Sequence, residues 1–159
     1  MPEQSERTSQ AEPRPAETVA VLGNGGWGSA LALLALRNGH NVRIWGVDQE
    51  YVAETARTRQ NPRYLPRIEF PTSILLTSDA HRACEGATLV VSAVPTQFIR
   101  KTVAAIGSAV PRAVPVVSVS KGLENGTLAR PTEILAQSLA GGDPRRAIAA
   151  LSGDRKSVV

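Results

Sequence analysis

The chain is poor in cysteine and in aromatic residues. Among its 159 residues there is one cysteine, Cys84, and aromatic residues make up 4%. A single cysteine excludes an intrachain disulfide and is compatible with a reducing cytoplasm, so we expect Cys84 to be a small buried apolar residue. No apolar run approaches the roughly 18 residues of a membrane-spanning helix. The N-terminus also lacks the apolar segment of a secretory signal.

Basic residues are in modest excess. The formal net charge is +4, and the densest basic stretch contains Arg57, Arg59, Arg63 and Arg67. Because this stretch holds a single aromatic residue and not the series of interleaved aromatic residues of a single-strand binder, we expect no nucleic-acid partner. A solvated face, or a face that steers an anionic substrate, fits better. Apolar residues make up 42%, which is typical of a globular chain with its own core.

Strand-like and helix-like segments alternate along the chain after a polar N-terminal stretch. Residues 1–16 are rich in Pro, Glu, Gln, Ser and Thr, which predicts a disordered tail. Asn61-Pro62 and Leu65-Pro66 predict a loop over residues 61–72. Strands are predicted at residues 18–22, 41–45, 74–77, 88–94, 114–119 and 147–151. Helices are predicted at residues 27–38, 49–59, 97–109 and 131–140, with a short one after Asp79.

The apolar pattern of these segments predicts the fold class. Trp27, Ala30, Leu31 and Leu34 fall on one face of the first helix, and Ile99, Val103 and Ile106 fall on one face of a later helix. The strands are continuous apolar runs, so they should be buried on both faces. We therefore expect an α/β fold with a doubly wound, mostly parallel sheet flanked by helices.

A glycine-rich turn connects the first strand to the first helix. Gly23-Asn24-Gly25-Gly26-Trp27-Gly28 matches G-x-G-x-x-G in the strand–turn–helix context that this motif requires. Gly23 would permit the tight turn, Gly25 would let a pyrophosphate approach the backbone, and Gly28 would let the helix pack closely on the strand. The helix start would offer free N–H groups to the phosphates. The turn predicts a dinucleotide site.

Asp48 lies 20 residues after Gly28, just beyond the second strand. This is the expected place for a carboxylate that binds the ribose hydroxyl groups of NAD, and its charge disfavours the 2′-phosphate of NADP. Asp48 is equally placed to cap the helix that starts at Gln49, and both roles are compatible.

Several segments together resemble the NAD-dependent glycerol-3-phosphate dehydrogenases. The likeness spans roughly residues 18–153 and implies that residues 17–153 form a Rossmann-type NAD-binding domain. It further implies a cytoplasmic enzyme that moves a hydride between NAD(H) and glycerol 3-phosphate or dihydroxyacetone phosphate. The segments are Trp27 in its helix, Asn38-Gly39-His40-Asn41-Val42, Ile44-Trp45, Asn61-Pro62-Arg63-Tyr64-Leu65-Pro66, Val91-Ser92-Ala93-Val94-Pro95-Thr96, Val119-Ser120-Lys121-Gly122-Leu123-Glu124 and Leu151-Ser152-Gly153.

The resemblance also implies site residues. Gly26 and Trp27 would line the cofactor. Pro95 would bind the cofactor, and Phe98 would pack on its nicotinamide side, although a plain core role for Phe98 stays open. Lys121 would contact both cofactor and substrate.

The position of Lys121 supports a role in contacting cofactor and substrate. The residue follows the carboxyl end of a predicted strand, which is where ligands bind in open parallel sheets. Its ammonium group would hold the substrate phosphate or polarise the carbonyl oxygen. A solvated surface lysine is the alternative. Gly153 would contact the substrate, and no metal site is expected.

The sequence departs from the family pattern at three places. Val47-Asp48 stands where basic residues are common, which weakens any expectation of NADP use. Gly26 replaces a commoner serine and leaves only its backbone N–H for the phosphates. Asp154 replaces the proline that follows Gly153 in the family.

The family has a second, helical domain after this point. It supplies the proton-transfer lysine and most of the grip on the substrate phosphate, and we expect it to be absent here. Residues 154–159 match what one reading frame of a common sequencing adapter encodes, so we expect them to be non-native; a short natural tail is the alternative. The resemblance implies a homodimer only for the full-length parent.

Two other functions remain open at this point. One is a different two-domain dehydrogenase with the same glycine turn, against which the N-P-R-Y-L-P and K-G-L-E segments argue. The other is a non-catalytic module that senses NAD through dimerisation.

The chain alone is expected to be nearly inactive with dihydroxyacetone phosphate and NADH. Positioning both reactants is worth on the order of 7–11 kcal/mol in favourable cases, and a nucleotide-binding half supplies little of it. A steady-state assay at high chain concentration measures this, and substantial turnover would contradict the expectation.

Overall fold

The structure is a computed structural model that describes residues 15–139 and 146–152. Most of the tail predicted at residues 1–16 lies outside the described residues. Gly153 and the segment 154–159 lie outside them as well.

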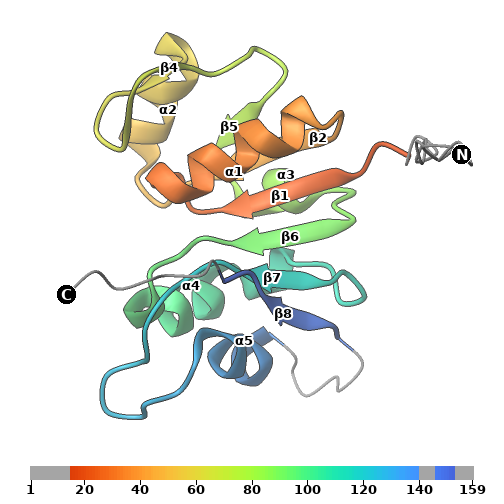
Figure 1. The fold of residues 1–159 in the computed structure, drawn as a ribbon, viewed down its shortest axis with the longest axis vertical. Coiled ribbons are helices and arrows are strands. Elements are labelled where there is room, and N and C mark those ends of the chain that lie inside the picture. The colour runs from red at the N-terminus through yellow and green to blue at the C-terminus, as the bar shows by residue number, and fades with distance from the viewer. Residues whose placement is uncertain (1–14, 140–145, 153–159) are drawn as a thin grey trace, which may run out of the picture.

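A six-stranded parallel sheet forms the centre of the fold (Figure 1). The strand order is β5-β2-β1-β6-β7-β8, and every neighbouring pair is parallel. The chain therefore winds outward from β1 in both directions, which leaves a crevice between the carboxyl ends of β1 and β6. The strands are β1 (Thr18–Leu22), β2 (Asn41–Trp45), β5 (Leu75–Thr77), β6 (Leu89–Ser92), β7 (Val116–Ser118) and β8 (Ile148–Ala150).

Helices cover the two faces of this sheet unequally. Alternate residues of β1 point to opposite faces, so Val19 and Val21 pack beside α1, while Ala20 and Leu22 pack against α3, α4 and α5. The helices are α1 (Gly26–Arg37), α2 (Gln49–Thr58), α3 (Ala80–Cys84), α4 (Ile99–Ile106) and α5 (Pro131–Leu139), with 3₁₀ turns at Thr96–Phe98 and Gly107–Ala109.

The predicted fold class is confirmed. The predicted cap of the short helix is also present, since Asp79 Oδ1 accepts from the N–H groups of His81 and Arg82. Ile99 and Val103 are buried on one face of α4, as the periodicity predicts.

Helix α1 buries a different face from its apolar stripe. Its buried residues are Gly28, Ser29 and Ala32, whereas Trp27 and Leu34 are 55% and 53% exposed. Because Gly28, Ser29 and Ala32 are small, this face of α1 can approach the sheet closely, and it is the face that is buried. The larger Trp27 and Leu34 lie outside this face and are exposed.

The prediction of a loop over residues 61–72 is wrong. The segment forms an antiparallel pair, β3 (Gln60–Asn61) with β4 (Leu65–Glu69). Pro66 is tolerated because β4 is an edge strand. The Arg59 side chain holds the far end of this hairpin, donating to the backbone carbonyls of Phe70, Pro71 and Ile74.

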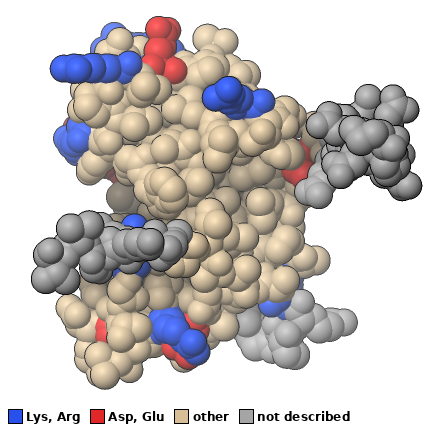
Figure 2. Space-filling view, in the orientation of Figure 1, with Lys and Arg blue, Asp and Glu red and all other residues tan. Residues whose placement is uncertain are grey.

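An apolar groove remains beside α1 on the sheet. Its volume is about 350 Å³, and Val19, Leu31, Val91, Val117 and Leu151 are among the residues that line it. On the face seen in Figure 2, charged side chains gather mainly toward the edges. Within the described residues, no helix combines the length and apolarity that a membrane crossing requires.

Phe70→Ala is expected to lower the free energy of unfolding by about 3–5 kcal/mol, because Phe70 is 1% exposed and anchors the hairpin in the core. Ile68→Ala is the matched control. Ile68 lies in β4 but is 42% exposed, so we expect a change within about 0.5 kcal/mol. Urea denaturation measures both variants, and equal losses would refute the anchoring role of Phe70.

Candidate functional site

A hollow of about 380 Å³ lies at the carboxyl ends of the central strands. It is bordered by the glycine turn after β1, by the end of β2 and by the turn after β6. Its lining includes Gly23, Gly25, Val47, Pro95 and Phe98. The structure therefore brings the glycine turn, Pro95 and Phe98 together around one space.

Two glycines in the turn are required by close packing. A Cβ on Gly28 would lie 2.2 Å from the carbonyl oxygen of Gly23 and 3.0 Å from the Ala93 Cβ. Gly23 has φ +119°, and a Cβ there would lie 2.9 Å from the Ala93 carbonyl oxygen. Side chains at these positions would push α1 away from β1 and β6.

Gly26 is explained by the β3–β4 hairpin. A Cβ on Gly26 would lie 2.6 Å from the backbone carbonyl oxygen of Tyr64. The commoner serine therefore does not fit this chain without a shift of the hairpin, and glycine at this position is a packing requirement.

Gly25 is different, because an added Cβ would meet no atom within 4 Å. Gly25 is also the N-cap of α1, which has neither a side-chain cap nor an acidic residue in its first turn. In contrast, carboxylates accept from N–H groups at the starts of α2, α3 and α5; they belong to Asp48, Asp79 and Glu133. The start of α1 thus presents uncapped N–H groups beside open space, which suits a phosphate.

A buried hydrogen-bond network connects the hairpin to the glycine turn. Asn61, which is 1% exposed, donates from Nδ2 to the Asn24 carbonyl oxygen at 2.8 Å and to Ser29 Oγ at 3.0 Å. Tyr51 Oη donates to Asn61 Oδ1 at 2.6 Å and accepts from the Arg63 N–H at 3.1 Å. The network fixes the glycine turn against both α2 and the hairpin.

Asp48 acts as the cap of α2, because its Oδ1 accepts from the Tyr51 N–H at 3.0 Å. Its Oδ2 lies 3.6 Å from Arg63 Nη1, and the two side chains are about half exposed. The capping alternative is therefore confirmed, and the ribose role of Asp48 stays a prediction.

Phe98 is 58% exposed, so the alternative of a core role is wrong. Trp27 is exposed in the first turn of α1 and does not border the hollow. Their contacts with a cofactor stay predictions.

Lys121 lies in a neighbouring hollow of about 290 Å³ at the ends of β7 and β8, together with Ser120, Arg130 and Ser152. Hydrogen bonds hold its loop against the turn after β6: Thr96 Oγ1 donates to the Lys121 carbonyl oxygen at 2.7 Å, and Ser120 Oγ donates to the Val94 carbonyl oxygen. Lys121 is exposed and does not line the first hollow, while Gly153 lies outside the described residues.

Sequence reasoning assigned no role at the dinucleotide site to Tyr51, Asn61, Arg63 or Tyr64. They meet around Asp48 and the glycine turn through pairings between segments far apart in the sequence. The local signal was the N-P-R-Y-L-P segment, which was used only for the resemblance.

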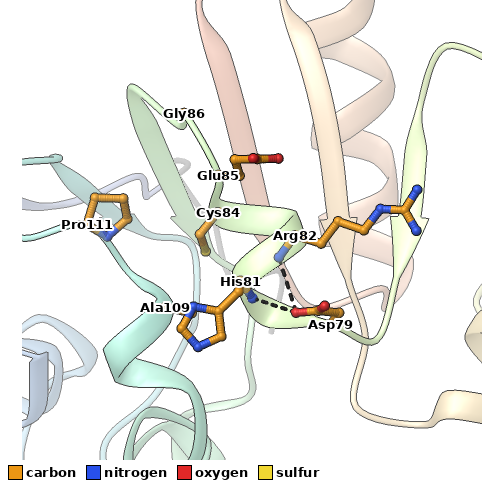
Figure 3. Close-up of a pocket in the computed structure, with 8 residues that line it drawn as sticks. All are labelled: Asp79, His81, Arg82, Cys84, Glu85, Gly86, Ala109 and Pro111. Atoms are coloured by element: carbon orange, nitrogen blue, oxygen red, sulfur yellow. Dashed lines mark hydrogen bonds between the residues drawn. The ribbon is translucent and has the colours of Figure 1, made fainter.

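A third, open depression of about 570 Å³ runs along α3 and the 3₁₀ turn after α4 (Figure 3). Burial raises the pKa of the Cys84 thiol to about 11, so the thiol stays protonated at neutral pH and is a poor nucleophile. This confirms Cys84 as a small buried residue. Within residues 15–139 and 146–152, no group of three or more His, Cys, Asp or Glu residues is placed to hold a metal ion.

Comparison with known proteins identifies similar sequences. The family model described as the N-terminus of NAD-dependent glycerol-3-phosphate dehydrogenase matches residues 18–155. A glycerol-3-phosphate dehydrogenase (NAD(P)+) of Chelativorans sp. is 43% identical over 136 residues, covering 86% of this chain and 40% of the relative. One from Geobacillus kaustophilus is 42% identical over 123 residues, covering 77% and 36%. The chain thus spans about two fifths of the length of these relatives.

Solved structures agree with the fold. Glycerol-3-phosphate dehydrogenase from Coxiella burnetii superposes with a TM-score of 0.76 at 29% identity, covering 87% of this chain and 41% of that one. The Saccharomyces cerevisiae protein gives a TM-score of 0.73 at 22% identity, covering 89% and 43%. The second likeness supports the fold alone.

Gly28→Ala is expected to lower the free energy of unfolding by about 1–3 kcal/mol, because its Cβ would strike the Gly23 carbonyl oxygen. Gly25→Ala, three residues away, faces open space at an ordinary φ of −66°, and should change stability by less than about 1 kcal/mol. Thermal and urea unfolding measure both. A Gly28→Ala variant as stable as Gly25→Ala would contradict the packing argument.

Proposed function

We propose a function from one premise: this chain belongs to the family of NAD-dependent glycerol-3-phosphate dehydrogenases and corresponds to their N-terminal part. The proposed role of the chain is to bind the dinucleotide and to position its nicotinamide end. For the whole protein, we propose hydride transfer between NAD(H) and glycerol 3-phosphate or dihydroxyacetone phosphate. The family match favours this reaction over that of another two-domain dehydrogenase.

The uncapped start of α1 carries the proposal. Its first-turn N–H groups have no side-chain cap, and Gly25 leaves open the space that a Cβ would occupy. A pyrophosphate would accept from the N–H groups of Gly26, Trp27 and Gly28, and the positive end of the helix dipole would stabilise its charge. The residues present therefore fit a dinucleotide.

Each remaining site residue has a proposed task on this chain. The free part of the Asp48 carboxylate would accept from a ribose hydroxyl, and Pro95 and Phe98 would limit the space at the nicotinamide side. Lys121 would hold the substrate oxygen or phosphate, and Gly153 would contact the substrate. Bound NAD(H) supplies the hydride chemistry.

Location and partners are proposed on the same basis. A small phosphorylated substrate follows from the family. A cytoplasmic location is supported by the single, buried, protonated Cys84. We propose a homodimer for the full-length protein and no nucleic-acid partner.

Gly25→Ala is expected to weaken NADH binding about tenfold or more while the fold stays intact. The added methyl group would occupy the space proposed for the pyrophosphate and cost at least one charge-assisted hydrogen bond. Isothermal titration calorimetry measures the affinity of both proteins.

Gly39→Asn is the control. It adds a side chain at the other end of α1, at φ +84°, where asparagine is tolerated. We expect its NADH affinity to match the unsubstituted chain. A folded unsubstituted chain that releases no heat with NADH would overturn the proposed function.

A further inference from the structure

Arg63 occupies a position at the ribose side of the site that the proposed function does not use. Its guanidinium carbon lies 4.2 Å from the centroid of the Tyr51 ring and 5.9 Å from that of Tyr64. The two rings are nearly perpendicular, at 86°. The guanidinium therefore rests on an aromatic support, in a cation–π arrangement.

The base of Arg63 is fixed while its head stays accessible. Its backbone N–H donates to Tyr51 Oη, which connects it through Asn61 to the Asn24 carbonyl oxygen in the glycine turn. Its side chain is nevertheless 55% exposed. The site thus holds a cation at a set place relative to the phosphate-binding turn.

The partner of this cation is Asp48, at 3.6 Å. An isolated carboxylate at this place would repel a phosphate on the neighbouring ribose hydroxyl. A paired guanidinium offsets that charge, and its planar fork matches two oxygens of a phosphate group. Because the Arg63–Asp48 ion pair is half exposed, it contributes little free energy, and Arg63 can leave Asp48 for a phosphate group at little cost.

We propose that Arg63 is a specificity-determining residue that lets the site accept dinucleotides with a phosphate on the adenosine ribose as well as those without. With an unmodified ribose, Arg63 stays on Asp48, and the carboxylate accepts from the hydroxyl groups. With a 2′-phosphate, Arg63 turns to the phosphate while Tyr51 still supports its plane. This inference rests on the proposed function, because it assumes that a dinucleotide binds here.

Arg63→Gln tests the proposal by calorimetric titration of the whole chain with NADH and with NADPH. We expect NADPH to bind about 10- to 100-fold more weakly, since a hydrogen bond to a charged group is lost. NADH should change less than about threefold, because its ribose does not need the cation. The ratio of the two affinities is the readout that a purely structural role would not move.

Arg57→Gln is the matched control. It removes the same charge from an exposed position in the last turn of α2, and both affinities should stay within about threefold. If Arg63→Gln does not fold, Arg63→Lys tests the same ratio. This variant keeps the charge and loses the planar fork, and the NADPH-to-NADH affinity ratio should fall about three- to tenfold.

The outcomes separate the two proposals. Failure of the folded, unsubstituted chain to bind either dinucleotide overturns the proposed function. NADH binding with an NADPH-to-NADH ratio unchanged by the substitution overturns the role of Arg63 and leaves the proposed function standing.

Discussion

The carboxamide of Asn61 is buried, and it donates to the Asn24 carbonyl oxygen and to Ser29 Oγ while it accepts from Tyr51 Oη. An unmatched buried amide costs about 1–3 kcal/mol for each lost partner. The glycine turn, the start of α1, α2 and the β3–β4 hairpin therefore hold one arrangement that satisfies this side chain. The hairpin supplies a structural support for the turn, and the position of Arg63 follows from it.

The glycines of the turn differ in what surrounds them: three are packed against the backbone, and one borders open space. Gly23, Gly26 and Gly28 are required by backbone carbonyls of the protein itself, which lie within 3.0 Å of where a Cβ would be. A Cβ on Gly25 would have no atom within 4 Å, so packing within the protein does not explain why this residue is a glycine. A turn that looks uniform in sequence thus divides into three glycines that its packing requires and one that borders open space.

Much of this fold was predictable because its central strands are continuous apolar runs; the strand predicted at residues 18–22 is Thr18–Leu22 as observed. The cap by Asp48 was predictable too, because capping is local. The β3–β4 hairpin was not predictable in this way, because β3 has only two residues and β4 contains Pro66, which argues against a strand. Arg63 beside Asp48 depends on how that hairpin folds back, and no local pattern encodes it. The side of α1 that is buried depends on small residues, which an apolar periodicity undervalues.

The two indole groups of the chain lie in opposite surroundings. Trp27 is 55% exposed in the first turn of α1, whereas Trp45 is 6% exposed and donates from Nε1 to the Ser78 carbonyl oxygen at 3.0 Å. Their fluorescence therefore reports on different events. Emission from the solvated indole follows changes around the first turn of α1, and emission from the enclosed indole follows loss of the packed interior. One molecule thus carries separate optical signals for a helix start at its surface and for the integrity of its core.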